Sequence, residues 1–271
     1  MSIAPKQIGW SQKANLLWDI SRELDKTLNA MRIQGVPTTT STSTSTSSTT
    51  TTTTSIIPTT TTTTIFNPCP NCVQANVIIG TQTWQKCNLN VETYSDGTPI
   101  PQVTNPAAWA SLTTGAWCYV DNNAANGAVY GKLYNWYAVA GIYDAASLAN
   151  PLLRKQIAPV GYHVSSDVEW DTLSTFLGGD AISGGKLKET GACHWIGNTD
   201  ATNISGFTGL PGGSRTNLGG FGTVGFSGNF WTSADITLLF AFYRILSTSN
   251  GSLGINAEDL KYGYSVRCLL D

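Results

Sequence analysis

The chain has 271 residues, a net charge of −2 and only 12% charged residues. The near-neutral charge argues against a nucleic-acid-binding protein and against a polybasic membrane protein. The low charged fraction is unusual for a cytosolic enzyme and typical of an exported or particle-bound protein. The first 31 residues nevertheless lack the features of a secretory signal peptide, and no run of eighteen apolar residues predicts membrane insertion.

Residues 1–37 are predicted to form an anchoring or oligomerising helix. Ser11 is a suitable N-cap, and Gly35 and Pro37 would end the helix. Apolar residues recur at steps of three or four, which places them on one helix face. These are Leu17, Ile20, Leu24, Leu28 and Met31. A helix of about twenty residues cannot bury such a face alone, so we expect it to pack on other chains or on copies of itself as a homo-oligomer.

Residues 38–64 form a Thr-rich linker. The segment holds eighteen Thr and six Ser and no charged residue. It cannot form a core, and its β-branched Thr residues favour an extended backbone. We expect a stalk or a disordered spacer between the helix and a C-terminal head.

Residues 65–271 are predicted to form this head. Short apolar runs are separated by Gly-Gly, Pro-Gly, Asp-Gly and Asn-Gly turns, which is typical of short strands. One helix is predicted after the N-cap Ser166, ending at Gly178, and a second over residues 130–140. The predicted buried face of the first comprises Val168, Trp170, Leu173, Phe176 and Leu177, and that of the second Tyr130, Leu133, Tyr134, Tyr137 and Ala138. The head is therefore an α+β domain with short strands, few helices and long loops.

All six cysteines lie in the head. Cys69 and Cys72 have the spacing of a zinc or redox motif, but no second ligand pair and no strand–helix context accompany them. We expect a disulfide between them at the start of the head, and no metal site.

Enzyme motifs are weak in this chain. Gly220, Gly222 and Gly225 spell G-x-G-x-x-G, but neither a preceding buried strand nor a following helix start accompanies them. His163 and His194 lie in structural contexts, and no Gly-x-Ser-x-Gly element is present. We expect no catalytic residues and no cofactor.

Several segments of the head occur in an order that resembles a known family. They include "IGTQTWQKCNLN", "YGKLYNWYAV", "APVGYHVSSDVEWDTLSTFLGG", "GNFWTS" and "YGYSVRCLLD". Nearly all of residues 76–271 resembles the Fibrobacter succinogenes major paralogous domain. The resemblance implies a C-type-lectin-like fold, of the type shared with formylglycine-generating enzymes and retroelement-diversified phage proteins. It also implies an origin in surface proteins of Bacteroidetes-like bacteria or in their phages.

The resemblance has further implications for the cysteines. Relatives often have a Cys-Pro pair where this chain has Ala158 and Pro159. The partner of Cys268 is therefore left open between Cys118 and Cys193. Formylglycine-generating enzymes use a reactive cysteine pair late in the domain, where this chain has Cys268 alone, so oxidase chemistry is not expected.

A binding face is predicted between Arg215 and Tyr262. Aromatic and small polar residues alternate there with the scaffold residues Trp231 and Arg244, a composition typical of recognition surfaces. In phage proteins of the resembling fold, the matching region is often the ligand-binding face. The predicted residues are Phe226, Asn229, Asp235, Thr237, Phe240, Tyr243, Ser249, Asn250 and Asn256.

A helix, a linker and a lectin-like head without a signal peptide favour a phage virion fibre or decoration protein. We expect it on the capsid or tail surface of a virion assembled in the host cytoplasm. Its helix would contact other virion structural proteins, and its head a host cell-surface glycan or protein. The alternatives are a bacterial surface or exported binding protein of the same domain family and a purely structural capsid decoration.

Overall fold

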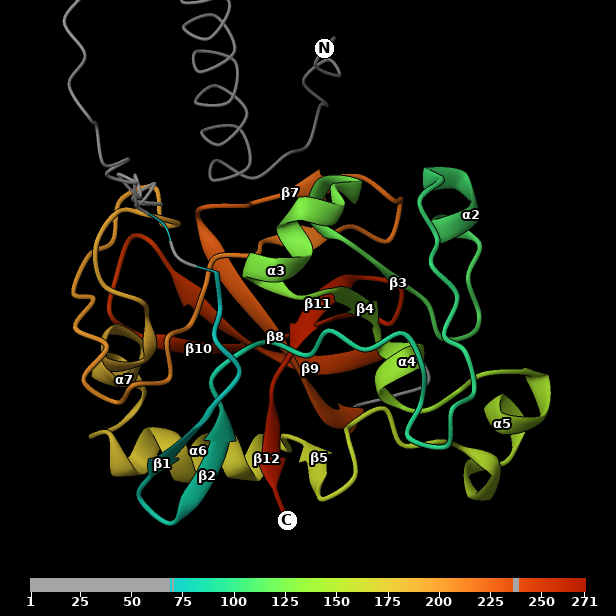
Figure 1. The fold of residues 1–271 in the computed structure, drawn as a ribbon, viewed down its shortest axis with the longest axis horizontal. Helices are drawn as coiled ribbons and strands as arrows, with labels where there is room; N and C mark the ends of the chain where they lie inside the picture. The colour runs from blue at the N-terminus through green and yellow to red at the C-terminus, as the bar shows by residue number, and fades with distance from the viewer. Residues whose placement is uncertain (1–68, 70, 236–238) are drawn as a thin grey trace, which may run out of the picture. The chain divides into compact units, whose positions relative to one another are not determined.

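The computed structural model describes residue 69 and residues 71–235 and 239–271 (Figure 1). The predicted anchor helix of residues 1–37 and the linker of residues 38–64 lie outside this part of the chain, as does Thr237. No helix within the described ranges is both long enough and apolar enough to cross a membrane.

The described residues form an α+β fold with two sheets. The smaller sheet has the strand order β1-β2-β12-β5. Its strands are β1 (Asn76–Ile79), β2 (Gln82–Gln85), β12 (Cys268–Leu270) and β5 (Tyr162–Val164). Leu269 of β12 pairs with Trp84 on one side and with His163 on the other, so the last strand closes the sheet (Figure 1).

The larger sheet has the order β10-β9-β8-β11-β4-β3, with β6 paired to β11 and β7 paired to β6. Its strands are β3 (Trp117–Cys118), β4 (Leu133–Asn135), β6 (Ser214–Arg215), β7 (Phe221–Gly222), β8 (Ser227–Asp235), β9 (Phe240–Ser247), β10 (Leu253–Asp259) and β11 (Gly263–Val266). Strands β8, β9 and β10 are antiparallel, whereas β11 runs parallel to β8. The parallel pair places residues 262–266 next to the β8–β10 meander.

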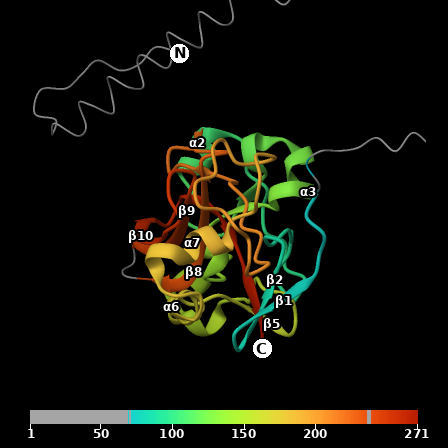
Figure 2. The same cartoon turned by 90° about the vertical axis from the view of Figure 1, so that its left-hand side faces the viewer.

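Short helices surround the sheets. They are α2 (Pro106–Ala110), α3 (Gly127–Tyr130), α4 (Trp136–Val139), α5 (Ala145–Ala149), α6 (Asp167–Phe176) and α7 (Asp180–Leu187), with 3-10 turns η1 (Val120–Asn122), η2 (Ala124–Asn126) and η3 (Pro151–Leu153). Helices α6 and α7 contact the β8–β10 meander (Figure 2). A core of Trp170, Phe207, Phe230 and Leu246 fills the space between them.

The helix predicted after Ser166 is confirmed as α6. The Ser166 side chain accepts a hydrogen bond from Glu169 N, and the Glu169 carboxylate accepts one from Ser166 N, which forms a capping box. Trp170, Leu173 and Leu177 are buried as predicted. Val168 and Phe176 are 73% and 63% exposed, so the buried face is narrower than predicted.

The continuous helix predicted over residues 130–140 is wrong. The chain leaves α3 at Gly131, whose φ of +69° is outside the helical range, and continues into β4. A Cβ on Gly131 would lie 2.7 Å from the Leu89 carbonyl oxygen, so this close backbone approach requires glycine. Asn135 then caps α4 by accepting from Ala138 N. Leu133, Tyr134 and Ala138 are nevertheless buried, as predicted.

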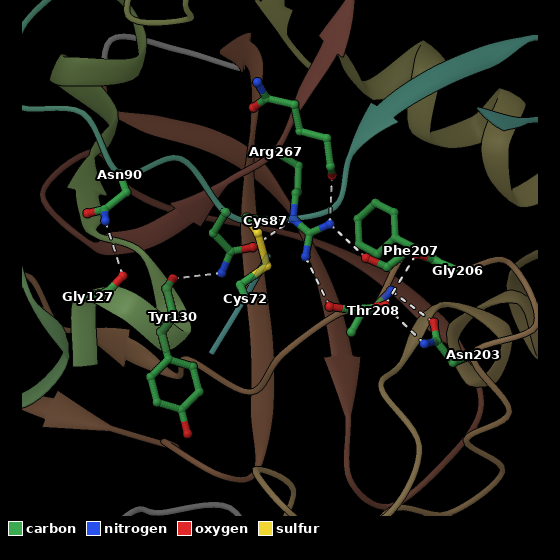
Figure 3. Close-up of a disulfide and its surroundings, with 12 residues drawn as sticks. Cys72, Cys87, Asn90, Gly127, Tyr130, Asn203, Gly206, Phe207, Thr208 and Arg267 are labelled. Atoms are coloured by element: carbon green, nitrogen blue, oxygen red, sulfur yellow. Dashed lines mark hydrogen bonds between the residues drawn. A yellow bond between two sulfur atoms is a disulfide. The ribbon is translucent and has the colours of Figure 1, made fainter. Parts of the chain in front are cut away.

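The disulfide expected between Cys69 and Cys72 is also wrong. Cys72 is bonded to Cys87, because the β1–β2 hairpin brings the residues before and after it side by side (Figure 3). Cys118 and Cys268 are buried thiols, so the pairing expected for Cys268 does not form. Burial raises the pKa of Cys118 to about 11 and that of Cys268 to about 12.

Arg267 is a fully buried guanidinium near this disulfide (Figure 3). It donates to Asn88 Oδ1 at 2.7 Å and to the carbonyl oxygens of Gln85, Phe207 and Thr208 at 2.9, 2.8 and 3.1 Å. Its centre lies 4.2 Å from the Phe207 ring centroid. One side chain, next to the start of β12, thus connects the end of β2 with residues 207 and 208 of the segment between α7 and β6.

Candidate ligand-binding face

The residues predicted to form one binding face are separated in the structure. Phe226, Ser249 and Asn250 lie at the end of the meander where Ser227 pairs with Ser247. Asp235 and Phe240 lie at the opposite end, where Asp235 pairs with Ala241. An eight-residue strand such as β9 spans about 26 Å, so the two groups cannot contact one small ligand.

Two of the predicted residues have almost no exposed surface. Asn229 is 4% exposed and donates from Nδ2 to Gly213 O at 2.9 Å and to Ser227 Oγ at 3.0 Å. Tyr243 is 6% exposed and packs in the core. Asn229 is therefore too buried to contact a ligand, and Tyr243 can only support the more exposed residues that pack on it.

The scaffold predicted for this region is well defined. Arg244 is buried and donates from Nε to Asp167 Oδ1 at 2.9 Å and from Nη2 to Asp171 Oδ1 at 2.7 Å. Trp231 is buried and donates from Nε1 to Tyr134 O at 2.9 Å. The first set of bonds fixes β9 to α6, and the second fixes β8 to β4.

A cluster of tyrosines comes from β9 and from residues 262–264, which follow β10 and begin β11. The Tyr264 ring is 4.6 Å from the Tyr243 ring and 5.6 Å from the Tyr262 ring, measured between centroids. The Tyr243 side chain hydrogen-bonds to those of Tyr264 and Asn256. Asn256 is exposed and Tyr262 is partly exposed. Tyr243, Tyr262, Tyr264, Asn256 and Glu258 are called the tyrosine face below.

The face carries the carboxylate of Glu258, and alternation along β10 places the carboxylate of the next residue, Asp259, on the other side of the strand. Glu258 and Asn256 are two residues apart on β10, opposite Ala241 and Tyr243, so their side chains share one side of the strand. Asp259 accepts a hydrogen bond from Asn217 Nδ2 at 3.4 Å. Within residues 69, 71–235 and 239–271, no Lys or Arg forms a salt bridge with either acid.

The electrostatic environment of the tyrosine face shifts several pKa values in one direction. Burial, together with the charge of Asp259, raises the pKa of Glu258, although a hydrogen bond from the Asp259 backbone opposes the change. Burial and the neighbouring charges, including that of Glu258, raise the pKa of Tyr243, Tyr262 and Tyr264. The three hydroxyl groups therefore stay protonated at neutral pH. Perturbed groups gathered at one place mark candidate functional sites.

The tyrosine face combines the groups that recognise polyhydroxylated or amide-containing ligands. Glu258 and the Asn256 carbonyl can accept hydrogen bonds, the Asn256 amide can donate, and the Tyr262 ring offers apolar area. No group of three His, Cys, Asp or Glu side chains in the described part of the chain is placed to hold a metal ion. The arrangement suits binding by hydrogen bonds and stacking.

A second polar cluster lies at the edge of the smaller sheet. His163 Nδ1 is 2.6 Å from Asp271 Oδ1, and His163 Nε2 is 2.6 Å from Glu169 Oε1. Partial burial lowers the pKa of His163, but the bonds to the two carboxylates outweigh this effect and raise it overall. The adjoining cavity has a volume of about 550 Å³. Because both ring nitrogens are occupied, His163 is unsuited to act as a general base.

The sequence prediction did not include three residues of the tyrosine face, namely Tyr262, Tyr264 and Glu258. The two tyrosines belong to the "YGYSVRCLLD" segment. Because this segment resembles a motif of the family, it is interpreted from the sequence as part of the structural scaffold and not of the binding face. Their spacing of two residues around Gly263 was the available signal, because it puts both on one side of an extended chain.

Comparison with protein families gives one match. The model of the Fibrobacter succinogenes major domain matches residues 77–269. Comparison of the chain with curated proteins and with solved structures finds no match.

Proposed function

Since the chain belongs to the Fibrobacter succinogenes major domain family, we propose that its head binds the surface of a host bacterium as part of a phage virion fibre or decoration protein. The receptor is a cell-surface glycan or protein. Residues 1–37 attach the protein to other virion chains, and residues 38–64 separate this anchor from the head. The motif resemblance supports a C-type-lectin-like fold for the head.

The tyrosine face is the observation that carries this proposal. Burial of the Glu258 carboxylate, near the charge of Asp259 and with no Lys or Arg salt bridge in the described part of the chain, is unfavourable for folding. The feature is therefore better explained by binding than by stability. Sugar hydroxyls and peptide amides can donate to the Glu258 carboxylate while an apolar ligand surface covers the Tyr262 ring.

We expect each single site to bind weakly and many copies on one particle to bind tightly together. A face with one partly exposed tyrosine and two or three polar groups suits a dissociation constant of roughly micromolar to millimolar. Several copies on one particle raise the effective affinity by about 10²–10⁴ when the linkers allow simultaneous contact. This arrangement requires no catalysis by the head.

The test uses the full chain displayed in many copies on fluorescent beads. The probes are a panel of bacterial cells and an array of bacterial surface polysaccharides. Tyr262→Ala should weaken binding by about 1–3 kcal/mol per site, or roughly 5- to 150-fold, as for other aromatic contacts. Phe226→Ala is the matched control, because Phe226 is an exposed aromatic residue at the other end of the meander.

The outcomes separate the candidate functions. Loss of binding on Phe226→Ala, with Tyr262→Ala unchanged, would move the site to the other end of the meander. If the beads bind no cell and no polysaccharide, a structural decoration role replaces attachment. Thermal melts of both variants establish that any loss of binding is not a loss of fold.

A further inference from the structure

A second pair of cysteines meets at the start of the head. Cys69 is three residues before Cys72, and Cys193 lies in the loop between α7 and β6. The two thiols are hydrogen-bonded to each other. Cys69 is partly buried, and Cys193 is exposed.

Cys69 is restrained by the disulfide next to it. Cys72 is bonded to Cys87 (Figure 3). The backbone N–H of Cys72 donates to Ala128 O at 3.1 Å. Three residues extend at most about 11 Å, so Cys69 is restricted to a small volume near Cys72. Its side chain is close enough to Tyr130 for its charge to contribute to the raised pKa of that phenol, after burial and the charge of Glu189.

Cys193 is restrained by the loop around it. Asn198 Nδ2 donates to the carbonyl oxygens of Glu189 and Gly191 at 2.7 and 2.8 Å, which closes the loop. His194 Nδ1 is 2.8 Å from Glu189 Oε2, and the His194 ring packs 5.8 Å from the Tyr130 ring. Tyr130 thus lies near both cysteines, and the two thiols meet between fixed segments.

We propose that Cys69 and Cys193 form a second disulfide when the protein meets an oxidising medium. The oxidant is a low-molecular-weight disulfide such as oxidised glutathione. The two protein thiols lose two protons and two electrons, and the oxidised glutathione is reduced to two glutathione molecules. The reaction passes through a mixed disulfide, as thiol–disulfide exchange requires.

In the proposed sequence of steps, Cys69 attacks the glutathione disulfide first. The hydrogen bond to Cys69, desolvation and the charges of Cys69 and Glu189 raise the pKa of Cys193 to about 11. This effect favours the protonated form of Cys193, which is a poor nucleophile. Once Cys69 carries glutathione, its hydrogen bond and charge no longer hold the proton on Cys193. Cys193 then attacks the Cys69 sulfur and releases the second glutathione.

The second disulfide would attach the beginning of the head at two points. The Cys72–Cys87 bond connects it to the end of the β1–β2 hairpin, and the Cys69–Cys193 bond would connect it to the loop after α7. A pulling force applied through the preceding residues would then be carried by covalent bonds and not by the hydrogen bonds between β1 and β2. This role does not depend on which ligand the head binds.

The test is peptide mapping of the full chain after equilibration with oxidised and reduced glutathione. Trypsin cleavage after Lys and Arg gives three relevant peptides. Peptide 33–86 contains Cys69 and Cys72, peptide 87–132 contains Cys87 and Cys118, and peptide 189–215 contains Cys193. We expect all three to be joined without reductant and separated after reduction. Alkylation of the denatured, unreduced chain should label two of the six cysteines, Cys118 and Cys268.

Two variants sharpen the result. Cys69→Ser should release peptide 189–215 while peptides 33–86 and 87–132 stay joined. Cys118→Ser is the matched control, because it removes a buried thiol and should leave the three-peptide complex intact. Labelling of four cysteines in the wild-type chain, or a Cys193–Cys193 bond between two chains, would overturn the proposal. The wild-type map decides the question even if a variant fails to fold.

Discussion

Replacement of Arg267 by Met should cost a large part of the stability of the head. Met preserves most of the apolar stem that packs on Phe207, but it removes the guanidinium that donates to Asn88 Oδ1 and three carbonyl oxygens. A buried acceptor left without a partner costs about 1–3 kcal/mol. Four acceptors at the lower value give about 4 kcal/mol, a sizeable fraction of the 5–15 kcal/mol typical of a domain.

Part of this cost is offset, because burial of the charge is itself unfavourable and lowers the pKa of Arg267 to about 9. We therefore expect a loss of about 3–5 kcal/mol in the free energy of unfolding, measured by urea denaturation. Arg154→Met is the control, since the Arg154 side chain makes one hydrogen bond, to Ser147 O at 3.4 Å. A loss below about 1 kcal/mol for Arg267→Met, with an unchanged denaturant slope, would refute this reasoning.

Four other outcomes are expected. Because the pKa of Glu258 is raised in the folded state, ionisation of Glu258 destabilises the fold as pH rises above 4.5. Glu258→Gln should therefore raise the melting temperature at neutral pH and lose this gain in acid. Equal melting temperatures of the variant and the wild-type protein at neutral pH would contradict this prediction. Because the pKa of His163 is raised in the folded state, protonated His163 stabilises the fold below pH 6.5, and this stability is lost as pH rises through the pKa of the folded state. His163→Gln should therefore cost more stability in mild acid than in mild base. A cost that does not depend on pH would be inconsistent with the two ion pairs. Leu24→Asp should prevent incorporation of the protein into virions, measured by particle composition, while circular dichroism shows that the head stays folded. Normal incorporation would disprove the anchoring role of residues 1–37. Deletion of about half of residues 38–64 should leave the melting temperature unchanged, whereas a large decrease would show that the segment packs on the head.

Features determined by neighbouring residues were predictable from the sequence. The capping box of α6 depends on Ser166 and Glu169, three residues apart, and was found from that spacing. The helix predicted over residues 130–140 failed because contacts of Gly131 with Asn88 and Leu89, some forty residues earlier, decide the backbone there. Periodicity could still identify Leu133, Tyr134 and Ala138 as core residues.

The disulfide and the tyrosine face also depend on contacts between residues that are distant in sequence, which local patterns do not reveal. The Cys69–Cys72 spacing suggested a local bond, but hairpin pairing, with Lys86 N donating to Ala75 O at 2.8 Å, brings Cys72 to Cys87 instead. Composition selected residues 226–256 for the predicted binding face, but it could not tell which side of each strand faces the core. Tyr262 joins the face only because β11 lies parallel to β8, a pairing that no local pattern encodes.

The position of β12 in the smaller sheet has a consequence for biosynthesis. Because Leu269 pairs with both Trp84 and His163, the β1–β2 hairpin and β5 have no common neighbour until residues 268–270 have emerged from the ribosome. The exposed backbone groups of β2 and β5 are unpaired sheet edges during translation, and such edges can pair with other nascent chains. We therefore expect the smaller sheet to close only after residues 268–270 have left the ribosome, and chains stalled before residue 268 to be substrates for chaperones and proteases.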